Sequence, residues 1–301
     1  MDLKIWLHAF RLRTLPLAIS CIAMGGFLAV ADQAFQWDIF LLCILTTIFL
    51  QILSNLANDY GDSIHGADSA DRQGPKRAVQ SGRISSAQMK TAVIIFVVLC
   101  LISGTTLLIV SFGINWQAML FFFCLGLLSI AAAIAYTVGR KPYGYAGLGD
   151  LSVLIFFGLV GVLGSYYLFA QRISWHQILP ALSCGFFSIC VLNVNNIRDI
   201  ESDRRAGKFS IPVRIGRDKA IKYHWFLLLT GIFSAIVYSA LTATSWWQWL
   251  FLLSLPLFLR NGLAVANKPS EQLDPYLKQM ALSTLVFVVL FGVGLILSTK
   301  I

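Results

Sequence analysis

Nine apolar segments, each about as long as a membrane-spanning helix, constrain the fold of this chain more than any other feature. A spanning helix needs about 20 mostly apolar residues. Only 12% of the 301 residues are charged, about half the share found in a water-exposed domain. The sequence therefore predicts an all-α integral membrane protein and excludes a soluble enzyme. We expect helices at about 14–31, 38–57, 88–111, 116–137, 150–169, 177–197, 221–241, 246–261 and 277–298.

The positive charges predict how these helices are oriented. Lys and Arg gather in the N-terminal segment and in every second loop, and only Arg172 and Lys300 fall on the other side. An excess of Lys and Arg marks cytoplasmic loops. We therefore expect a multi-pass protein of the inner (cytoplasmic) membrane, with the N-terminus in the cytoplasm and the C-terminus outside. The net charge of +9 follows from this arrangement, so we expect no nucleic-acid partner.

Two similar polar motifs stand where the two longest cytoplasmic loops begin. In the first motif, Asn58 is followed four residues later by Asp62. In the second, Asn195 and Asp199 repeat this spacing at an offset of 137 residues, and Asp203 extends the row by one turn. Residues four apart on a helix share a face. Each motif is therefore expected to point an amide and a carboxylate in one direction.

The offset between the motifs also predicts an internal duplication. The first motif ends the second predicted helix and the second motif ends the sixth, four helices later. We expect one transmembrane domain over residues 1–301, with its long cytoplasmic loops forming caps. Its predicted parts are two four-helix pseudo-repeats at about 14–137 and 150–261 and a last helix at 277–298.

Clustered carboxylates at helix ends indicate a bound cation. An acidic group near the bilayer centre costs about 2.5–3.5 kcal/mol, and neighbouring carboxylates repel one another. Hard oxygen ligands without His or Cys suit Mg²⁺, which is held by one or two carboxylates and the phosphates of a substrate. A single such motif is typical of a helix cap, but two in register favour a shared site. The predicted catalytic carboxylates and metal ligands are Asp62, Asp199 and Asp203, with Asp59 and Asp68 as further metal ligands.

The surrounding side chains suit a diphosphate held at such a metal site. Lys and Arg side chains bind phosphate oxygens through charge-assisted hydrogen bonds, and the Asn58 and Asn195 amides face the same way as the carboxylates. The cations predicted to bind the diphosphate are Arg72, Lys76, Arg77, Arg140, Lys141 and Lys208.

These motifs resemble the signatures of the UbiA superfamily of intramembrane prenyltransferases, Asn-Asp-x-x-Asp-x-x-x-Asp and Asp-x-x-x-Asp. In this chain Gly66 replaces the last Asp of the first signature, and Asp68 follows two residues later. That variant is similar to the branch acting on 1,4-dihydroxy-2-naphthoate in menaquinone synthesis. Further similar stretches are Arg11-Leu12-Arg13-Thr14-Leu15-Pro16, Ala135-Tyr136-Thr137, Gly147-Leu148-Gly149-Asp150 and Ala206-Gly207-Lys208-Phe209-Ser210-Ile211, where Ser-Ile stands in place of the family's Thr-Leu.

The resemblance implies a fold and an activity. The fold is a nine-helix UbiA-type bundle. The activity is the Mg²⁺-dependent transfer of a polyprenyl group from polyprenyl diphosphate to 1,4-dihydroxy-2-naphthoate, with decarboxylation to demethylmenaquinol. It also implies that Arg11, Arg13 or Arg198 anchors the acceptor's carboxylate and that Tyr136 faces the allylic cation. Positive-inside orientation is the alternative explanation for the arginines, and an interfacial position is the alternative for Tyr136.

Two other functions stay open from the sequence. Another aromatic acceptor of the same superfamily, such as 4-hydroxybenzoate or a porphyrin-linked ring, would need the same two motifs. A secondary transporter would also have internal repeats and polar helix breaks. Transporters place their charged sites near the bilayer midplane, whereas these acids lie at helix ends, so the position of the motifs favours an enzyme.

Overall fold

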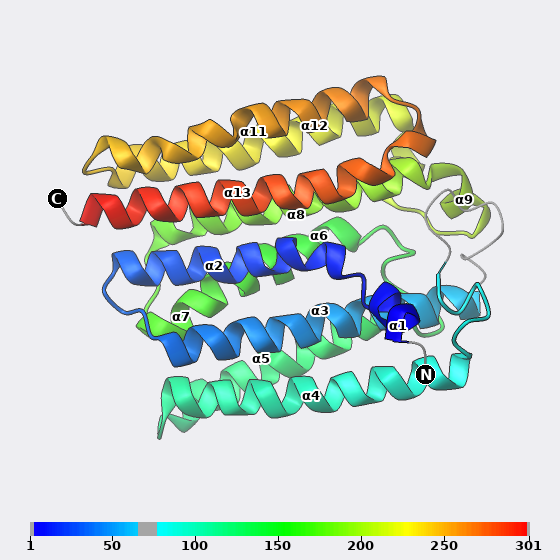
Figure 1. The fold of residues 1–301 in the computed structure, drawn as a ribbon, viewed down its shortest axis with the longest axis horizontal. Helices are drawn as coiled ribbons and strands as arrows, with labels where there is room; N and C mark the ends of the chain where they lie inside the picture. The colour runs from blue at the N-terminus through cyan, green and yellow to red at the C-terminus, as the bar shows by residue number, and fades with distance from the viewer. Residues whose placement is uncertain (1–2, 66–76, 300–301) are drawn as a thin grey trace.

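The computed structural model describes residues 3–65 and 77–299. In these residues nine helical spans are long and apolar enough to cross a membrane, and they run alternately in opposite directions along the bundle (Figure 1). The prediction of a nine-helix multi-pass membrane protein is therefore confirmed. The spans are Leu3–Ala31, Trp37–His65, Ser86–Phe112, Trp116–Ala135, Gly149–Ala170, Trp175–Arg198, Arg217–Thr242, Trp246–Asn267 and Asp274–Thr299.

Several spans consist of more than one helical element. The α-helices are α1 (Leu3–Phe10), α2 (Leu15–Ala31), α3 (Trp37–His65), α4 (Ser86–Phe112), α5 (Trp116–Ala135), α6 (Gly149–Val153), α7 (Ser165–Ala170), α8 (Ile178–Arg198), α9 (Ile200–Arg205), α10 (Ile211–Ile215), α11 (Arg217–Thr242), α12 (Leu255–Asn267) and α13 (Asp274–Thr299). The shorter or non-α elements are η1 (Leu12–Thr14), the π-helical η2 (Leu154–Gly164), η3 (Trp175–Gln177), η4 (Trp246–Ser254) and η5 (Ser270–Gln272).

One end of the bundle, here called the motif end, holds the C-terminal ends of α3 and α8 together with α9. The N-terminus lies at this end and the C-terminus at the opposite end (Figure 1). The termini are thus separated as the charge pattern predicts. Which end faces the cytoplasm stays a prediction, as does the division into two pseudo-repeats.

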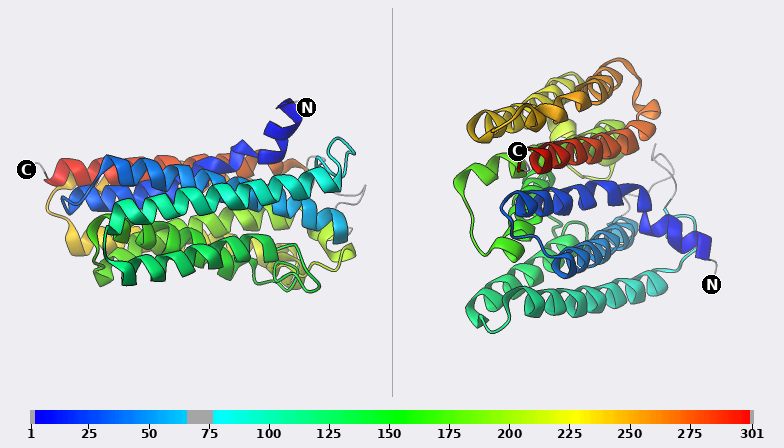
Figure 2. Two further views of the ribbon diagram at one scale, coloured as in Figure 1. Left: turned by 90° about the horizontal axis from the view of Figure 1, so that it is seen from below. Right: turned by 60° about the vertical axis from the view of Figure 1, so that its left-hand side comes forward.

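The first span begins earlier than predicted and is broken near its start. Arg11 adopts a left-handed backbone conformation with φ of 50°, which is unfavourable for a residue with a side chain and ends α1. Pro16 then lies in the first turn of α2, where its missing N–H costs no hydrogen bond. Trp6 and Ala9 anchor α1 in an apolar cluster with α3 and α4, and α1 leaves the bundle at an angle (Figure 2).

The second span extends to His65, eight residues beyond its predicted end. The first motif therefore lies on a continuous helix rather than at the start of a loop. Gly61 permits this, because a Cβ there would lie about 2.6 Å from backbone atoms of Thr137. The close contact packs the last turns of α3 against the segment that follows α5. It thereby buries polar residues that a hydropathy window would not assign to a membrane-spanning helix.

The two sides of the bundle differ in packing. α8 lies against η2, α11 and α13, and α13 also contacts α2 and η4. Aromatic rings fill this side, with Phe187 stacked on Phe258 at 4.3 Å and edge-on to Phe287 at 5.0 Å between ring centroids. α4 and α5 instead form an outer layer, and among the residues of α5 only Ile130 is buried. The outer layer leaves room for a cavity between itself and α3.

Candidate active site

Side chains from both motifs meet at the motif end. Asp203 lies close enough to Asp62, Asp199 and Lys208 for each of them to act on its pKa. Burial raises the pKa of Asp203 above its ordinary value, and repulsion by Asp199 and Asp62 adds to this, while Lys208 opposes it. Asp62 of α3 and Asp199 of the α8–α9 junction, both predicted site carboxylates, thus lie within electrostatic range of Asp203.

In the first motif, Asp62 points into this cluster and is 3% exposed. It forms an ion pair with Arg77, and its other oxygen accepts a hydrogen bond of 2.8 Å from the Tyr145 hydroxyl. Arg77 also donates to the backbone carbonyl of Asn58 at 2.9 Å. The Asn58 side-chain oxygen accepts a bond of 3.2 Å from Thr137 Oγ1. A network of side chains and backbone atoms therefore fixes the Asp62 carboxylate.

Asp59 faces a different part of the chain. Its carboxylate accepts backbone N–H bonds from Ala78 at 3.1 Å and Val79 at 3.4 Å, and the residue is 1% exposed. Asp59 thereby holds the segment that directly follows Arg77, so it stabilises the approach of Arg77 to Asp62. Asp68, Arg72 and Lys76 lie outside the described residues.

In the second motif, Asp199 is bound at both oxygens by its neighbour Arg198, at 2.8 Å from Nε and 2.7 Å from Nη2. The buried Arg198 guanidinium also donates to Asn195 Oδ1 at 2.8 Å and to Asp274. Asp274 accepts a second hydrogen bond of 3.0 Å, from Arg13. Two of the arginines predicted to anchor the acceptor are thus joined by a carboxylate at the start of α13.

Asp203 and Lys208 form a tight turn at the end of this motif. The Lys208 amide donates to the Asp203 carbonyl at 2.8 Å, and Gly207 supplies the left-handed conformation between them, with φ of 71°. Lys208 Nζ lies 3.2 Å from Asp203 Oδ2. Burial lowers the pKa of Lys208, but Asp203, Tyr136 and Asp62 outweigh this effect and raise the pKa above its ordinary value. Lys208 is therefore held as a cation.

Tyrosines from the segment between α5 and α6 cover the cluster. The Tyr136 ring packs edge-on to Tyr143 at 5.4 Å between centroids. A Cβ at Gly149 would lie 2.9 Å from the Tyr136 hydroxyl, and one at Gly144 would lie 2.9 Å from the ring. The absence of a Cβ at these two glycines therefore lets the Tyr136 ring approach the backbone closely. Burial raises the pKa of Tyr136 to about 12 and also raises the pKa of Tyr145, so both phenols are neutral near pH 7.

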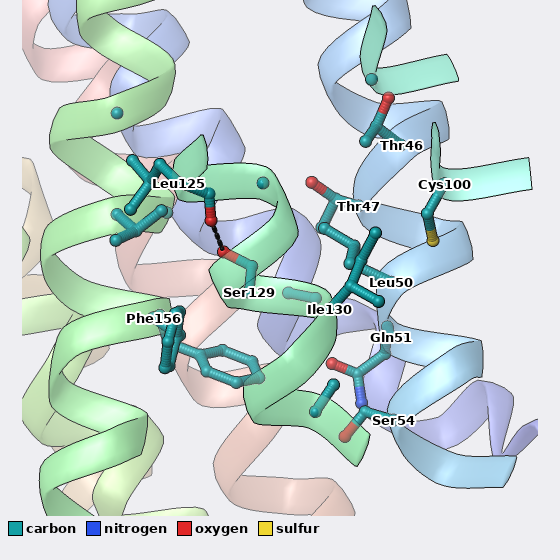
Figure 3. Close-up of a pocket in the computed structure, with 18 of the residues that line it drawn as sticks. Thr46, Thr47, Leu50, Gln51, Ser54, Cys100, Leu125, Ser129, Ile130 and Phe156 are labelled. Atoms are coloured by element: carbon teal, nitrogen blue, oxygen red, sulfur yellow. Dashed lines mark hydrogen bonds between the residues drawn. The ribbon is translucent and has the colours of Figure 1, made fainter. Parts of the chain in front are cut away.

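A cavity of about 390 Å³ opens beside this cluster, between α2, α3, α4, α5 and η2. Figure 3 shows the α3 side chains Thr47, Gln51 and Ser54 on one side and Phe156 of η2 on the other. The polar lining residues follow α3 toward the motif end. The far walls are apolar and include Leu107, Leu108, Phe122, Phe157, Val160 and Leu168.

The remaining predicted cations are placed less centrally. Arg140 and Lys141 are exposed, and Arg13 is engaged with Asp274 as described. Arg11 stands at the turn between α1 and η1. Asn55 fixes this turn from the cavity wall, donating to Phe10 O at 3.0 Å and to Thr14 Oγ1 at 3.1 Å. The turn that carries Arg11 therefore lies beside the polar end of the cavity.

The donor chemistry at the motif end fits a hard cation. Asn196 Oδ1 is buried without a hydrogen bond, and Asp203 Oδ2 is buried with the Lys208 ammonium 3.2 Å away. Oxygen atoms of these kinds are the ligands that Mg²⁺ takes. Within residues 3–65 and 77–299, however, no three His, Cys, Asp or Glu side chains are grouped as a complete metal site. The carboxylates are instead paired with Arg77, Arg198 and Lys208. The site therefore suits Mg²⁺ that brings phosphate ligands with it.

Sequence reasoning missed Tyr145, Asn196 and Asp274. Asn196 was adjacent to the predicted Asn195, and the helical period could have indicated that it also faces inward. Tyr145 and Asp274 reach the motifs across 83 and 76 residues of chain. No local pattern marks such contacts.

Comparisons with known proteins agree with this architecture. The profile of the UbiA prenyltransferase family matches residues 18–286. A 1,4-dihydroxy-2-naphthoate octaprenyltransferase from Haemophilus influenzae is 44% identical over 299 residues, covering 98% of this chain and 96% of the relative. The enzyme of the same name from Escherichia coli (strain K12) is 44% identical over 294 residues, covering 97% and 95%.

Solved structures are similar at lower identity. A UbiA homologue from Aeropyrum pernix K1, in its apo form, has a TM-score of 0.67 at 17% identity, covering 96% of this chain and 97% of that chain. A homologue from Archaeoglobus fulgidus, bound to GPP and Mg²⁺, has a TM-score of 0.63 at 17% identity, covering 96% and 99%. These similarities concern the fold.

Proposed function

This chain belongs to the UbiA prenyltransferase family, and we propose that it transfers a polyprenyl group from polyprenyl diphosphate to 1,4-dihydroxy-2-naphthoate in menaquinone biosynthesis. The two relatives named 1,4-dihydroxy-2-naphthoate octaprenyltransferase, each 44% identical over nearly the whole chain, support this acceptor. The structural observation that carries the proposal is that Asp62, Asp199 and Asp203 each pair with a buried cation, next to a cavity with apolar walls. A diphosphate headgroup and an isoprenoid tail need those two environments side by side.

The reaction balances without a covalent enzyme intermediate. The C–O bond between the prenyl carbon and the diphosphate breaks, and the leaving group takes the electron pair. The allylic cation then forms a C–C bond with the ring carbon that bears the carboxylate. That carboxylate leaves as CO₂ and its bonding electrons restore the aromatic ring. The product is demethylmenaquinol.

The chain's own charged residues bind the headgroup in this proposal. Asp62, Asp199 and Asp203 would hold Mg²⁺, which supplies charge stabilisation for the leaving diphosphate when bound. Arg77 and Lys208 are buried beside these carboxylates and would bind phosphate oxygens. The Archaeoglobus fulgidus homologue of the same fold is bound to GPP and Mg²⁺, which supports the binding of a prenyl diphosphate together with Mg²⁺.

The cavity and its tyrosine protect the reacting cation. Apolar walls exclude the water that would otherwise capture an allylic cation. The neutral Tyr136 ring lines the cavity, and an aromatic face attracts a cation. We therefore assign Tyr136 to the wall nearest the reacting carbon and the far apolar walls to the prenyl tail.

Arg11 is the arginine that best fits the acceptor's carboxylate. Its turn is held at the polar end of the cavity by Asn55. Arg198 already binds Asp199, Asn195 and Asp274, and Arg13 binds Asp274 in an exposed position. We propose that Arg11 anchors the acceptor, that Arg198 orders the second motif, and that the motif end faces the cytoplasm.

One assay tests the proposed function. The purified protein is given Mg²⁺, a labelled prenyl diphosphate and a panel of aromatic acids, and both prenylated product and released CO₂ are measured. We expect turnover of 1,4-dihydroxy-2-naphthoate with one CO₂ per product. Turnover of 4-hydroxybenzoate in its place would contradict the acceptor assignment. Transport of a prenyl diphosphate without chemistry would contradict the enzyme itself.

A further inference from the structure

A second charged feature lies away from the active site, on the outer surface of α12. Arg260 is exposed within the span Trp246–Asn267. It stands seven residues before the end of α12 at the motif end, about 10 Å along the helix axis at 1.5 Å per residue. An ionisable side chain inside a membrane span is expensive unless it has a partner. The packing of the helices does not explain why an exposed arginine stands within this span.

Arg260 lies in a groove rather than on a smooth surface. The groove also includes Lys268 and Tyr276 near the motif end and Leu259 and Leu263 along α12. The two leucines are 52% and 48% exposed, so they present apolar surface to the lipid. The groove therefore has two cations toward one end and an apolar floor along its length.

The scaffold behind the groove is fixed. Arg217 of α11 donates to the Lys268 carbonyl and, at 2.6 Å, to Ser270 Oγ. Gly262 packs on the Trp225 ring so closely that a Cβ would lie 2.5 Å from it. The backbone of α12 and of the segment that follows it is thus held by α11, whereas the Arg260 side chain is exposed. This arrangement preserves the spacing between the two cations.

The residues that the structure describes supply no counter-charge for these cations. The lining residues of the groove include no Asp or Glu, and among the described residues no ion pair involves Arg260 or Lys268. Arg side chains near a helix end extend toward the headgroup region while their methylenes stay in the apolar layer. A negatively charged group at headgroup depth would complete the site.

We propose that this groove binds an anionic phospholipid, with its phosphate between Arg260 and Lys268 and an acyl chain along Leu259 and Leu263. Basic pockets between helices bind acidic headgroups in this way. Tyr276 lines the same groove and provides an amphipathic ring at the interface, the position that tyrosine favours. The site is independent of the catalytic cluster and does not rest on the proposed reaction.

The test measures lipid-dependent stability of the full-length protein in a neutral detergent. Dioleoylphosphatidylglycerol is titrated against the melting temperature, with dioleoylphosphatidylcholine as the neutral lipid. We expect a saturable rise in the melting temperature with the anionic lipid alone, weakened by salt. The double variant R260Q/K268Q should bind the anionic lipid about tenfold or more weakly, because each cation near a membrane surface contributes about 1 kcal/mol.

Matched variants make the result specific. K222Q/K278Q removes two exposed lysines of α11 and α13 that do not line the groove, and it should keep the full response. Arg260→Lys keeps the charge and should also respond.

Three results would overturn the proposal: an unchanged response in R260Q/K268Q, an equal response to the neutral lipid, or a full response to inorganic phosphate alone. Loss of a dimer in R260Q/K268Q with an intact lipid response would instead identify a second copy of the chain as the occupant.

Discussion

The two motifs share one spacing but use it differently. In the first, α3 continues without a break, so Asp59 and Asp62 leave the helix in different directions, one toward backbone amides and one toward the site. In the second, α8 ends at Arg198 and α9 starts at Ile200. The chain bends at Asp199, and its carbonyl accepts the Asp203 amide at 2.8 Å. A repeated pattern therefore predicts a shared location without predicting a shared role.

The source of the balancing cations differs too. The second motif carries its own, because Arg198 adjoins Asp199 and Lys208 follows Asp203 by five residues. The first motif takes its cation, Arg77, and a neutral hydrogen-bond donor, Tyr145, from other segments of the chain. The balancing cations of the second motif thus lie close to it in sequence, whereas the first motif depends on how distant segments pack. Substitutions in the two regions should separate these cases.

The largest loss of turnover is expected from removing a carboxylate that either motif contributes to the headgroup site. Asp62→Asn and Asp203→Asn each remove a carboxylate from the headgroup site and should lower turnover by roughly a hundredfold or more. EDTA should abolish turnover in the unmutated enzyme, and added Mg²⁺ should restore it. Circular dichroism and the melting temperature check that each variant is folded. Turnover near the unmutated rate in either variant would remove that carboxylate from the site.

A smaller effect is expected at Asp59, where the two motifs differ. Asp59→Ala leaves the Ala78 and Val79 amides without their acceptor, which should cost about 1–3 kcal/mol of stability. Because the segment after Arg77 loosens, turnover should fall by roughly tenfold, less than in Asp62→Asn. Thermal unfolding and turnover are measured together. Loss of turnover as severe as in Asp62→Asn, without loss of stability, would make Asp59 a metal ligand.

Tyr145→Phe directly tests the hydrogen bond that the Tyr145 hydroxyl donates to Asp62. It removes one hydrogen bond to Asp62 and keeps the ring, so turnover should fall several-fold, in line with about 1 kcal/mol for one hydrogen bond. Tyr143→Phe is the matched control, because its hydroxyl binds Ala132 O and Ser152 instead. Equal effects of the two variants would show that the hydroxyl of Tyr145 has no particular role at Asp62.

The smallest effect is expected from Arg13→Gln. Its ion pair with Asp274 is partly exposed, with 39% of the Arg13 side chain accessible, and exposed pairs contribute about 0.2–1 kcal/mol. Stability should change within that range and the acceptor's KM should stay within about twofold. Arg11→Gln should instead raise that KM. A large rise in Arg13→Gln alone would transfer the anchoring role to Arg13.

The parts that followed from sequence were those with a local physical cause. Apolar length identified the nine spans, and the Asn58 and Asn195 spacing located the motif end. The extension of α3 to His65 did not follow, because it needs the contact between Gly61 and Thr137. The direction of Asp59 did not follow either, since it depends on where Ala78 returns to α3. Hydropathy and residue spacing describe one segment at a time, whereas the extension of α3 and the direction of Asp59 each depend on a contact between two segments that are distant in sequence.

The bond between Arg198 and Asp274 has a consequence for biogenesis. Arg198 closes the sixth span, but Asp274 belongs to the ninth. A ribosome-bound chain that has released eight spans would hold a buried guanidinium with one acceptor still missing. The second motif would then mature only when the last span arrives, so chains truncated before α13 should insert into the bilayer yet fail quality control.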